Sequence, residues 1–250
     1  MTSSRVTERN IVGTTMRVAE LWRYPVKSLL GEQLDSVRVT ADGFEGDRRF
    51  AIYDLETGFG LTARRVPEML FASARLREDG SAEITLRDGS SPSSNGDLSD
   101  WLGRKVALRS SDTNGTRLFE NPRDFEHDRD WAPFEAADGP FHDSARTRVS
   151  LVSSATLGDW DRRRFRSNVL LDGEGEDDLV GSEVDLGEVR LNVGKHIERC
   201  VMTTRPQADG IERDLDVLRT IARDRGNRLA VGALVSRPGR IRVGDELARL

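Results

Sequence analysis

The sequence predicts a mainly β protein with a few helices, arranged as two β-barrel-like domains. Short runs of alternating apolar and polar residues, bounded by glycine, proline and aspartate, recur through both halves of the chain. Only a few segments carry apolar residues at the spacing that is typical of helices. A length of 250 residues, of which 36% are hydrophobic and 32% charged, is enough for two globular domains of ordinary size.

The first predicted domain covers residues 16–118. Residues 1–15 mix polar and charged side chains without a hydrophobic period, so we expect them to form a disordered tail. The serine-rich stretch at residues 88–97 predicts an exposed loop, and residues 97–103 predict a short helix. Strands are predicted at residues 18–26, 34–39, 50–53, 69–75, 84–87 and 105–109.

The second predicted domain covers residues 119–250 and is again rich in strands. Ser153 or Ser154 is suited to cap a helix that continues to about residue 163. A second helix is predicted at residues 214–225. Strands are predicted at residues 148–152, 169–172, 183–184, 189–193 and 230–235.

Composition excludes several classes of partner and compartment. The chain has 38 basic and 43 acidic residues, so its net charge of −5 gives no bias toward nucleic acid. The apolar stretches are only a few residues long, whereas a membrane-spanning helix needs about 20, so we expect no membrane contact. One cysteine excludes an internal disulfide, and no apolar signal segment occurs, so we expect a cytoplasmic protein. We also expect the protein to be a monomer.

Familiar catalytic motifs are absent from the sequence. It contains no Walker loop and no glycine fingerprint of a dinucleotide-binding fold. Three histidines and no G-x-S-x-G turn argue against a zinc site and a hydrolase triad. His142 and Asp143 precede a predicted strand, where a proton relay and an ordinary loop hydrogen bond both stay open.

Three places in the sequence can still carry chemistry. Cys200 follows Arg199, whose guanidinium group favours a reactive thiolate, although a small buried hydrophobic residue is an equally simple interpretation. Arg166 stands at the start of a strand, where its side chain can face an anion. Lys27 and Ser28 follow a proline turn, and an ammonium group beside a hydroxyl suits a phosphate.

Taken together and in order, six segments resemble the MOSC family, the family of the molybdenum cofactor sulfurase C-terminal domain. The resemblance is to the type with an N-terminal β-barrel domain, which includes the mitochondrial amidoxime-reducing proteins and their bacterial relatives. The segments are residues 21–28 (LWRYPVKS), 46–54 (GDRRFAIYD), 62–70 (TARRVPEML), 164–173 (RFRSNVLLDG), 199–204 (RCVMTT) and 238–247 (PGRIRVGDEL).

The resemblance implies a binding site for the molybdenum cofactor, Mo-molybdopterin, between the two domains. Cys200 matches the cysteine whose thiolate ligates molybdenum. Asn168 matches a family asparagine, with a plain hydrogen bond at the start of a strand as the alternative. The other cofactor-binding residues that the resemblance implies are Lys27, Ser28, Arg48, Thr147, Arg148, Arg166, Glu198 and Arg199.

The resemblance also implies an activity. We expect an oxidoreductase that reduces N-hydroxylated compounds, such as hydroxylamines, amidoximes and N-hydroxylated bases, by oxygen transfer to molybdenum. One cysteine cannot hold an iron–sulfur cluster, so a separate flavin, haem or iron–sulfur protein would supply electrons. The alternatives are a cofactor carrier or sulfur-transfer module without turnover of its own, and a barrel that has lost the metal.

This chain departs from the family pattern at residues 145–151 (ARTRVSL), around Thr147 and Arg148, where relatives have a Thr/Ser-Pro-like loop on the pterin. It also departs at two further places near the expected site. Ser167 stands where relatives commonly have proline, so we expect a looser turn there. Residues 205–207 (RPQ) replace the usual VDP-like sequence after the two threonines. Both places affect the expected substrate preference.

Overall fold

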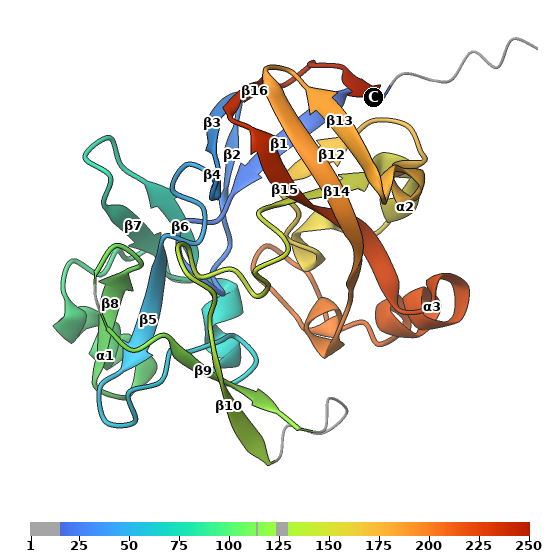
Figure 1. Ribbon diagram of the computed structural model, residues 1–250. Helices are drawn as coiled ribbons and strands as arrows, with labels where there is room; N and C mark the ends of the chain where they lie inside the picture. The colour runs from blue at the N-terminus through green and yellow to red at the C-terminus, as the bar shows by residue number, and fades with distance from the viewer. Residues whose placement is uncertain (1–15, 114, 124–129) are drawn as a thin grey trace, which may run out of the picture.

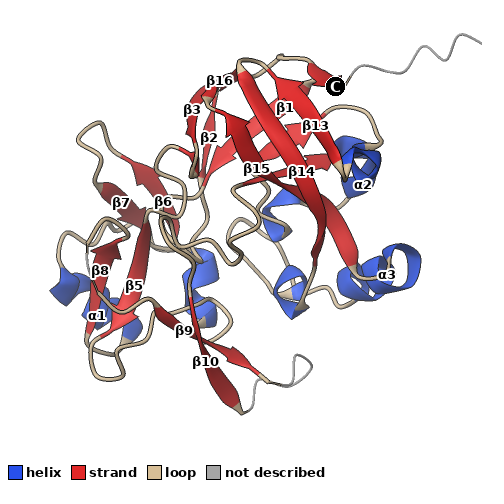
Figure 2. Ribbon diagram, in the orientation of Figure 1, coloured by secondary structure: helices blue, strands red, loops and turns tan. Residues whose placement is uncertain are grey.

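The computed structural model describes residues 16–113, 115–123 and 130–250. Strands make up 40% of the described residues and helices 17%, which confirms the mainly β prediction (Figures 1 and 2). The predicted tail at residues 1–15 lies outside the described residues. None of the described helices combines the length and the apolar character that crossing a membrane requires.

The largest sheet has eight strands and curls into a half-barrel. β11 and β12 run parallel, and every other pair of neighbours in this sheet is antiparallel. In spatial order the strands are β17 (Leu247–Arg249), β13 (Ser182–Leu186), β14 (Val189–Glu198), β15 (Arg228–Arg237), β11 (Val149–Ser153), β12 (Val169–Leu171), β1 (Val18–Arg23) and β2 (Glu32–Leu34).

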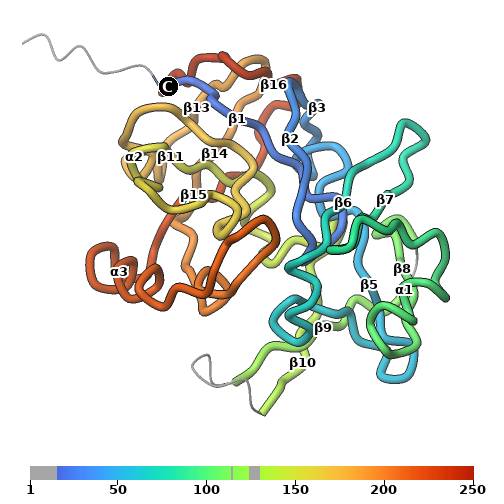
Figure 3. Tube along the Cα trace, turned by 180° about the vertical axis from the view of Figure 1, so that it is seen from behind, coloured from blue at the N-terminus to red at the C-terminus, as the bar shows by residue number. Residues whose placement is uncertain are grey.

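The first strands of the chain therefore belong to the same sheet as the last ones. β1 pairs with β12, and β3 (Ser36–Thr40) pairs with β16 (Gly239–Arg242) and with β4 (Gly43–Phe44). In Figure 1 the blue strands β1–β3 lie beside the yellow and red strands, and the view from behind in Figure 3 agrees. The pattern around residue 35 predicts one strand, but Asp35 separates β2 from β3.

The other half of the molecule is built from two-stranded pairs. β5 (Phe50–Asp54) pairs with β8 (Val106–Ser110), and β6 (Ser73–Leu76) pairs with β7 (Ala82–Thr85). β9 (Leu118–Pro122) and β10 (Trp131–Glu135) form a hairpin that the sequence analysis missed. The strand predicted at residues 69–75 is only half correct, because Pro67 opens the 3-10 helix η1 (Pro67–Phe71).

The helices are short, and their ends follow local sequence signals. Ser94 caps α1 (Asn95–Leu102) in a reciprocal capping box with Asp97. The helix predicted to reach residue 163 is wrong in length, because Gly158 ends α2 (Ser154–Leu157) after one turn. The remaining helices are α3 (Asp216–Arg225), η2 (Arg162–Arg164), η3 (Glu176–Leu179) and η4 (Val201–Thr204).

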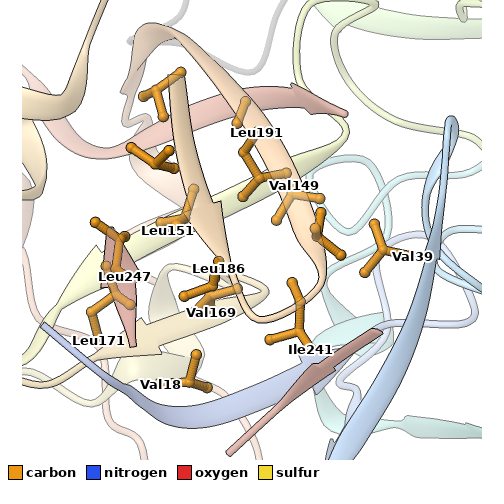
Figure 4. Packing of buried hydrophobic residues seen from close by; sticks show 14 of the residues in the cluster. Val18, Val39, Val149, Leu151, Val169, Leu171, Leu186, Leu191, Ile241 and Leu247 are labelled. Carbon is orange, nitrogen blue, oxygen red and sulfur yellow. The ribbon is translucent and has the colours of Figure 1, made fainter. Parts of the chain in front are cut away.

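The main hydrophobic core lies inside the curled sheet. Its alternating apolar residues point toward one another from strands at both ends of the chain (Figure 4). They include Val18 of β1, Val39 of β3, Val149 and Leu151 of β11, Val169 and Leu171 of β12, Leu186 of β13, Leu191 of β14, Ile241 of β16 and Leu247 of β17.

A second set of cores fills the other half and includes residues beyond position 118. Phe119, Ala136 and Phe141 pack with Ala51 and Tyr53 of β5. The chain thus crosses between the halves more than once. Val18 and Val39 lie in the core of the curled sheet, whereas Val26 and Leu29, between them in sequence, lie in a core of the other half. The division at residue 118 stays a prediction.

Candidate functional site

A cavity of about 470 Å³ lies at the junction of the two halves. Residues of the first half, such as Leu70, and of the second half, such as Met202, line the same wall. All ten residues that the sequence analysis selected line it as well: Lys27, Ser28, Arg48, Thr147, Arg148, Arg166, Asn168, Glu198, Arg199 and Cys200. Their roles toward a ligand stay predictions.

Lys27 is held rigidly in this wall by the proline turn that carries it. Its backbone N–H donates to the Phe50 carbonyl at 2.8 Å, which ties the turn to β5. The side chain is 5% exposed, donates to the Phe141 carbonyl at 3.0 Å and forms an ion pair with Asp143. An ammonium group fixed in this way presents a positive charge at a defined place in the cavity.

The Asp143 carboxylate stands in the cavity rather than in the protein interior, since 90% of its side chain is exposed. The charge of the Lys27 ammonium and its hydrogen bond lower the pKa of Asp143 to about 2 against the opposing effect of desolvation, and Arg48 and Arg166 add smaller contributions in the same direction as Lys27. Asp143 is therefore ionised at neutral pH and neutralises part of the local positive charge.

Asp47 organises the turn next to Lys27, and the sequence analysis did not single it out. Its side chain is fully buried and accepts hydrogen bonds from the Tyr24 N–H at 2.8 Å and from Asn168 Nδ2 at 3.1 Å. It also pairs with the Arg48 guanidinium. A buried carboxylate with three donors holds the segments around residues 24, 48 and 168 together. The sequence signal that could have indicated Asp47 was its position directly before Arg48 in the motif at residues 46–54.

Arg48 and Arg166 approach one another over the ring of Tyr24. Their guanidinium carbons lie 4.5 Å and 4.8 Å from the ring centroid. Arg48 also donates to the Arg166 carbonyl at 3.1 Å. Both residues adopt the left-handed backbone region, with φ of 49° and 54°, as does Ser28 with φ of 72°. Strained backbone of this kind in non-glycine residues is concentrated at functional sites.

The positive charges of Arg166 and Arg199 in the cavity are disfavoured by burial, and that of Arg166 also by repulsion from Arg48. Burial lowers the pKa of Arg166 to about 10, with Arg48 adding repulsion. Burial also lowers the pKa of Arg199 to about 10. Both guanidinium groups stay charged at neutral pH, so an anionic ligand would relieve an unfavourable arrangement of like charges.

Three arginines keep a buried N–H group without a partner among the described residues. These are Nη1 of Arg148, Nη1 of Arg166 and Nη2 of Arg199. Their other nitrogens are used, since Arg199 donates to the Leu229 and Phe165 carbonyls and Arg148 donates to the Asp138 carbonyl. Buried unpaired donors are costly, so three of them around one cavity indicate a site for ligand acceptors.

Asn168 has a different character from the arginines. Its Oδ1 accepts from the backbone N–H and the hydroxyl of Ser150, and its Nδ2 donates to Asp47 and to the Trp22 carbonyl. Both ends of the amide are thus used within the protein. These contacts are the hydrogen bonds that the sequence analysis kept as its alternative.

Thr147 and Arg148 lie on the loop that joins the two halves. A Cβ atom on Gly232 would come within 2.4 Å of Thr147 Oγ1, so the glycine in β15 permits this close approach. The Arg148 backbone N–H donates to the Ala233 carbonyl at 2.8 Å. The loop is therefore fastened to β15 at the edge of the cavity.

Cys200 lies two positions after the last residue of β14 and directly before η4, and it is partly exposed. Glu198 at the end of β14 is exposed. The loop after Cys200 is held by Arg164, which donates to the Thr203 carbonyl at 3.1 Å and to the Glu212 carbonyl at 2.7 Å. The sequence analysis included Arg164 only as the first residue of the segment at residues 164–173, so this positioning role was missed.

The donor set fits Mo-molybdopterin. The phosphate of that cofactor would supply acceptors for the unpaired guanidinium groups, and its dithiolene is a soft donor like the thiolate of Cys200. A single protein thiolate beside a cationic, hydrogen-bonding wall therefore suits a metal that arrives with most of its own ligands.

Two protein-family models match successive parts of the chain. The family model of the MOSC N-terminal beta barrel domain matches residues 15–129, and that of the MOSC domain matches residues 138–248. Among solved structures, the YuaD protein from Bacillus subtilis is similar with a TM-score of 0.41 and 14% identity, covering 94% of both chains.

Two curated relatives align over almost the whole chain. Molybdenum cofactor sulfurase of Drosophila grimshawi is 26% identical across 93% of this chain, which spans only 34% of the sulfurase. Mitochondrial amidoxime-reducing component 1 of Mus musculus is 27% identical across 94% of this chain and 81% of its own length. The two domain models together match most of the chain. The chain therefore belongs to the MOSC family and carries the N-terminal MOSC beta barrel domain.

Proposed function

We propose that this protein is a molybdenum cofactor-binding oxidoreductase that reduces N-hydroxylated compounds such as hydroxylamines, amidoximes and N-hydroxylated bases. Membership of the MOSC family supports a function linked to the molybdenum cofactor. The observation that carries the proposal is the group of three unpaired guanidinium N–H groups in the cavity that also contains Cys200.

The residues divide into groups by the part of the cofactor that they suit. Lys27, Ser28, Arg48 and Arg166 gather cationic and hydroxyl donors that would hold the anionic phosphate end. The loop residues at 147–148 and the strand end at 198–199 would lie along the pterin. Cys200 would supply the thiolate ligand to molybdenum. When bound, the cofactor supplies two-electron redox chemistry at a metal that accepts oxygen from the N-hydroxyl group.

The protein itself contributes binding, orientation and charge. The Asp47 network fixes the backbone that presents Arg48, and Arg164 fixes the loop that follows Cys200. Positive charge around the cavity favours an anionic cofactor and would stabilise negative charge that develops near it. We further propose that a separate flavin, haem or iron–sulfur protein delivers the electrons.

A second candidate function is a cofactor carrier or sulfur-transfer module. The similarity to molybdenum cofactor sulfurase over 93% of this chain favours it. A carrier would bind the cofactor or carry a persulfide on Cys200 without turnover of a substrate. The two functions separate in one assay, because only the reductase consumes hydroxylamine when a chemical reductant is present.

The proposal is tested by molybdenum and pterin analysis of protein purified from a host that makes molybdopterin. Wild type is compared with Cys200→Ser and with Arg219→Gln, a control on the exposed surface of α3. We expect molybdenum close to one atom per chain in wild type and in the control, and a large loss in Cys200→Ser. Benzyl viologen oxidation with hydroxylamine then distinguishes reductase from carrier. Absence of both molybdenum and pterin from wild type would refute the proposal.

A further inference from the structure

A second cavity, of about 610 Å³, adjoins the cavity that contains Cys200. Gln207 lines both, and it is the one residue that the two walls share in the part of the chain that the structure describes. Leu70 lines the first cavity, and its neighbour Phe71 lines the second. The partition between the cavities therefore consists of Gln207 on one side and the end of η1 on the other.

Gln207 acts in this partition through its bulk. The residue is 3% exposed, and its side-chain Oε1 has no hydrogen-bond partner among the described residues. Its backbone N–H donates to the Ile211 carbonyl at 2.9 Å, which fixes the point from which the side chain extends. The backbone is thus tied down, whereas the side-chain carbonyl fills space between the two cavities.

The segment around Gln207 is fastened on both sides. Before it, Arg164 donates to the Thr203 carbonyl at 3.1 Å. After it, Arg163 pairs with Asp209 at 3.0 Å, and Arg164 donates to the Glu212 carbonyl at 2.7 Å. Because these contacts hold the backbone in place, the size of the side chain at position 207 decides whether the two cavities connect.

The second cavity suits a hydrocarbon group. Its wall includes Leu30 and Ile211, which are buried, and Phe71 and Leu86, which pack against a core of the first half. The Arg87 guanidinium lies 4.6 Å from the centroid of the Phe71 ring and so covers part of this apolar surface. Burying one methylene group in such surroundings strengthens binding by about fourfold.

We propose that Gln207 limits the length of the substrate, so that compact N-hydroxylated compounds fit the cavity beside Cys200 and longer ones meet the partition. This inference rests on the proposed function, because the N-hydroxyl group has to reach the metal that Cys200 would ligate. Gln207 is the last residue of the segment at 205–207, where this chain departs from the family pattern. The closed partition therefore makes this departure a determinant of substrate size.

The reaction leaves the hydrocarbon group unchanged. An amidoxime, R–C(=NOH)NH2, takes up two electrons from the reductant and two protons from water. Its N–O bond breaks, and an amidine, R–C(=NH)NH2, and water are formed. The group R takes no part in this chemistry, so its fit against Gln207 governs selection through binding.

Three variants separate the bulk of Gln207 from its amide. Gln207→Ala removes the side chain beyond Cβ and should open the partition. Gln207→Met keeps a chain of similar size without the amide and should leave the partition closed. The matched control is Gln33→Ala, at the other glutamine of the chain, which is exposed in β2.

The measurement is isothermal titration of the cofactor-loaded proteins with unbranched alkyl amidoximes of increasing length, without reductant, so that no turnover occurs. Thermal unfolding is the control for folding. In wild type, Gln207→Met and Gln33→Ala, we expect the affinity to rise with chain length and then to change less than about twofold over about four further methylene groups. In Gln207→Ala the same groups should raise the affinity about tenfold. With benzyl viologen as reductant, kcat/KM for long relative to short amidoximes should rise in Gln207→Ala alone.

Each outcome decides the inference. A wild-type affinity that keeps rising with chain length overturns it without any variant, since the cavities would then already connect. The same length profile in wild type and Gln207→Ala overturns it as well, while the proposed function stands because short amidoximes still bind. Gln207→Met that behaves like Gln207→Ala shows that the amide rather than the bulk matters, and this also overturns it. Wild type that binds no amidoxime of any length refutes the proposed function and this inference together.

Discussion

Replacing His142 by asparagine changes how the stability of the protein depends on pH. In the folded protein burial lowers the pKa of His142 from its usual 6.5 to about 4. The folded state therefore binds fewer protons than the unfolded state between these two values. The stability due to the neutral ring is complete above pH 6.5 and is lost as pH falls toward 4.

The size of this effect follows from the two pKa values. A lowering from 6.5 to about 4 corresponds to about 3 kcal/mol when the titration is complete, and about 2 kcal/mol of this is lost by pH 5. The side chain is 7% exposed, so solvent screens it little. His142→Asn removes the titrating group and should remove this part of the pH dependence.

The assay is urea unfolding of wild type and His142→Asn at pH 8 and pH 5, followed by tryptophan fluorescence. We expect the difference in unfolding free energy between the two proteins to change by about 2 kcal/mol between these pH values, in favour of the variant at pH 5. All other titrating groups are common to both proteins and cancel in this comparison. A difference that is the same at both pH values would mean that the ring is not held neutral by burial.

Three further predictions concern the hydrogen bonds of Asp47, the close approach at Gly60 and the hydrophobic core at Leu191, and equilibrium unfolding tests each of them. Asp47→Asn should cost about 3 kcal/mol because it removes the charge of a fully buried carboxylate and leaves the partly buried Arg48 guanidinium without its counter-charge. Asp143→Asn, at a mostly exposed carboxylate, should cost less than about 1 kcal/mol, and equal losses would contradict the role given to Asp47. Gly60→Ala should cost about 1–3 kcal/mol, because its Cβ would lie 2.1 Å from the neighbouring phenylalanine ring, and an unchanged melting temperature would disprove the close approach. Leu191→Ala, at a fully buried position in β14, should cost about 2–5 kcal/mol, and a loss below about 1 kcal/mol would show that this core can collapse around the gap.

Local signals in the sequence were sufficient for many elements. Alternating residues in β1 and β5 and the helical spacing in α3 each depend on neighbours within a few positions. The prediction for α1 began at residue 97, because it did not use the capping serine at position 94. The shorter α2 shows the same rule, since the glycine at position 158 was a visible stop signal that the prediction did not use.

Long-range pairing was beyond the reach of these patterns. The β9–β10 hairpin lies in a segment without clear alternation, and its apolar residues are buried against β5 rather than within the hairpin itself. The pairing of β1 with β12 joins residues about 150 positions apart, for example Leu21 with Val169. A strand's periodicity shows that one face is buried but does not show which strand lies beside it.

The candidate site divides in the same way. The order of the motifs brought ten residues to attention, and the fold places all ten around one cavity. Their partners were not visible, because Asp47 and Arg164 act through hydrogen bonds to segments that are distant in sequence.

By itself, the sequence determined the mainly β class, the local ends of most elements and the residue types that can hold an anionic cofactor. Only the tertiary structure decided which half of the molecule each strand joins, which arginine nitrogens remain unpaired and how deeply His142 is buried. The physical reason is that propensity and capping act over a few residues, whereas burial, charge repulsion and hydrogen-bond satisfaction depend on every segment that meets at a site.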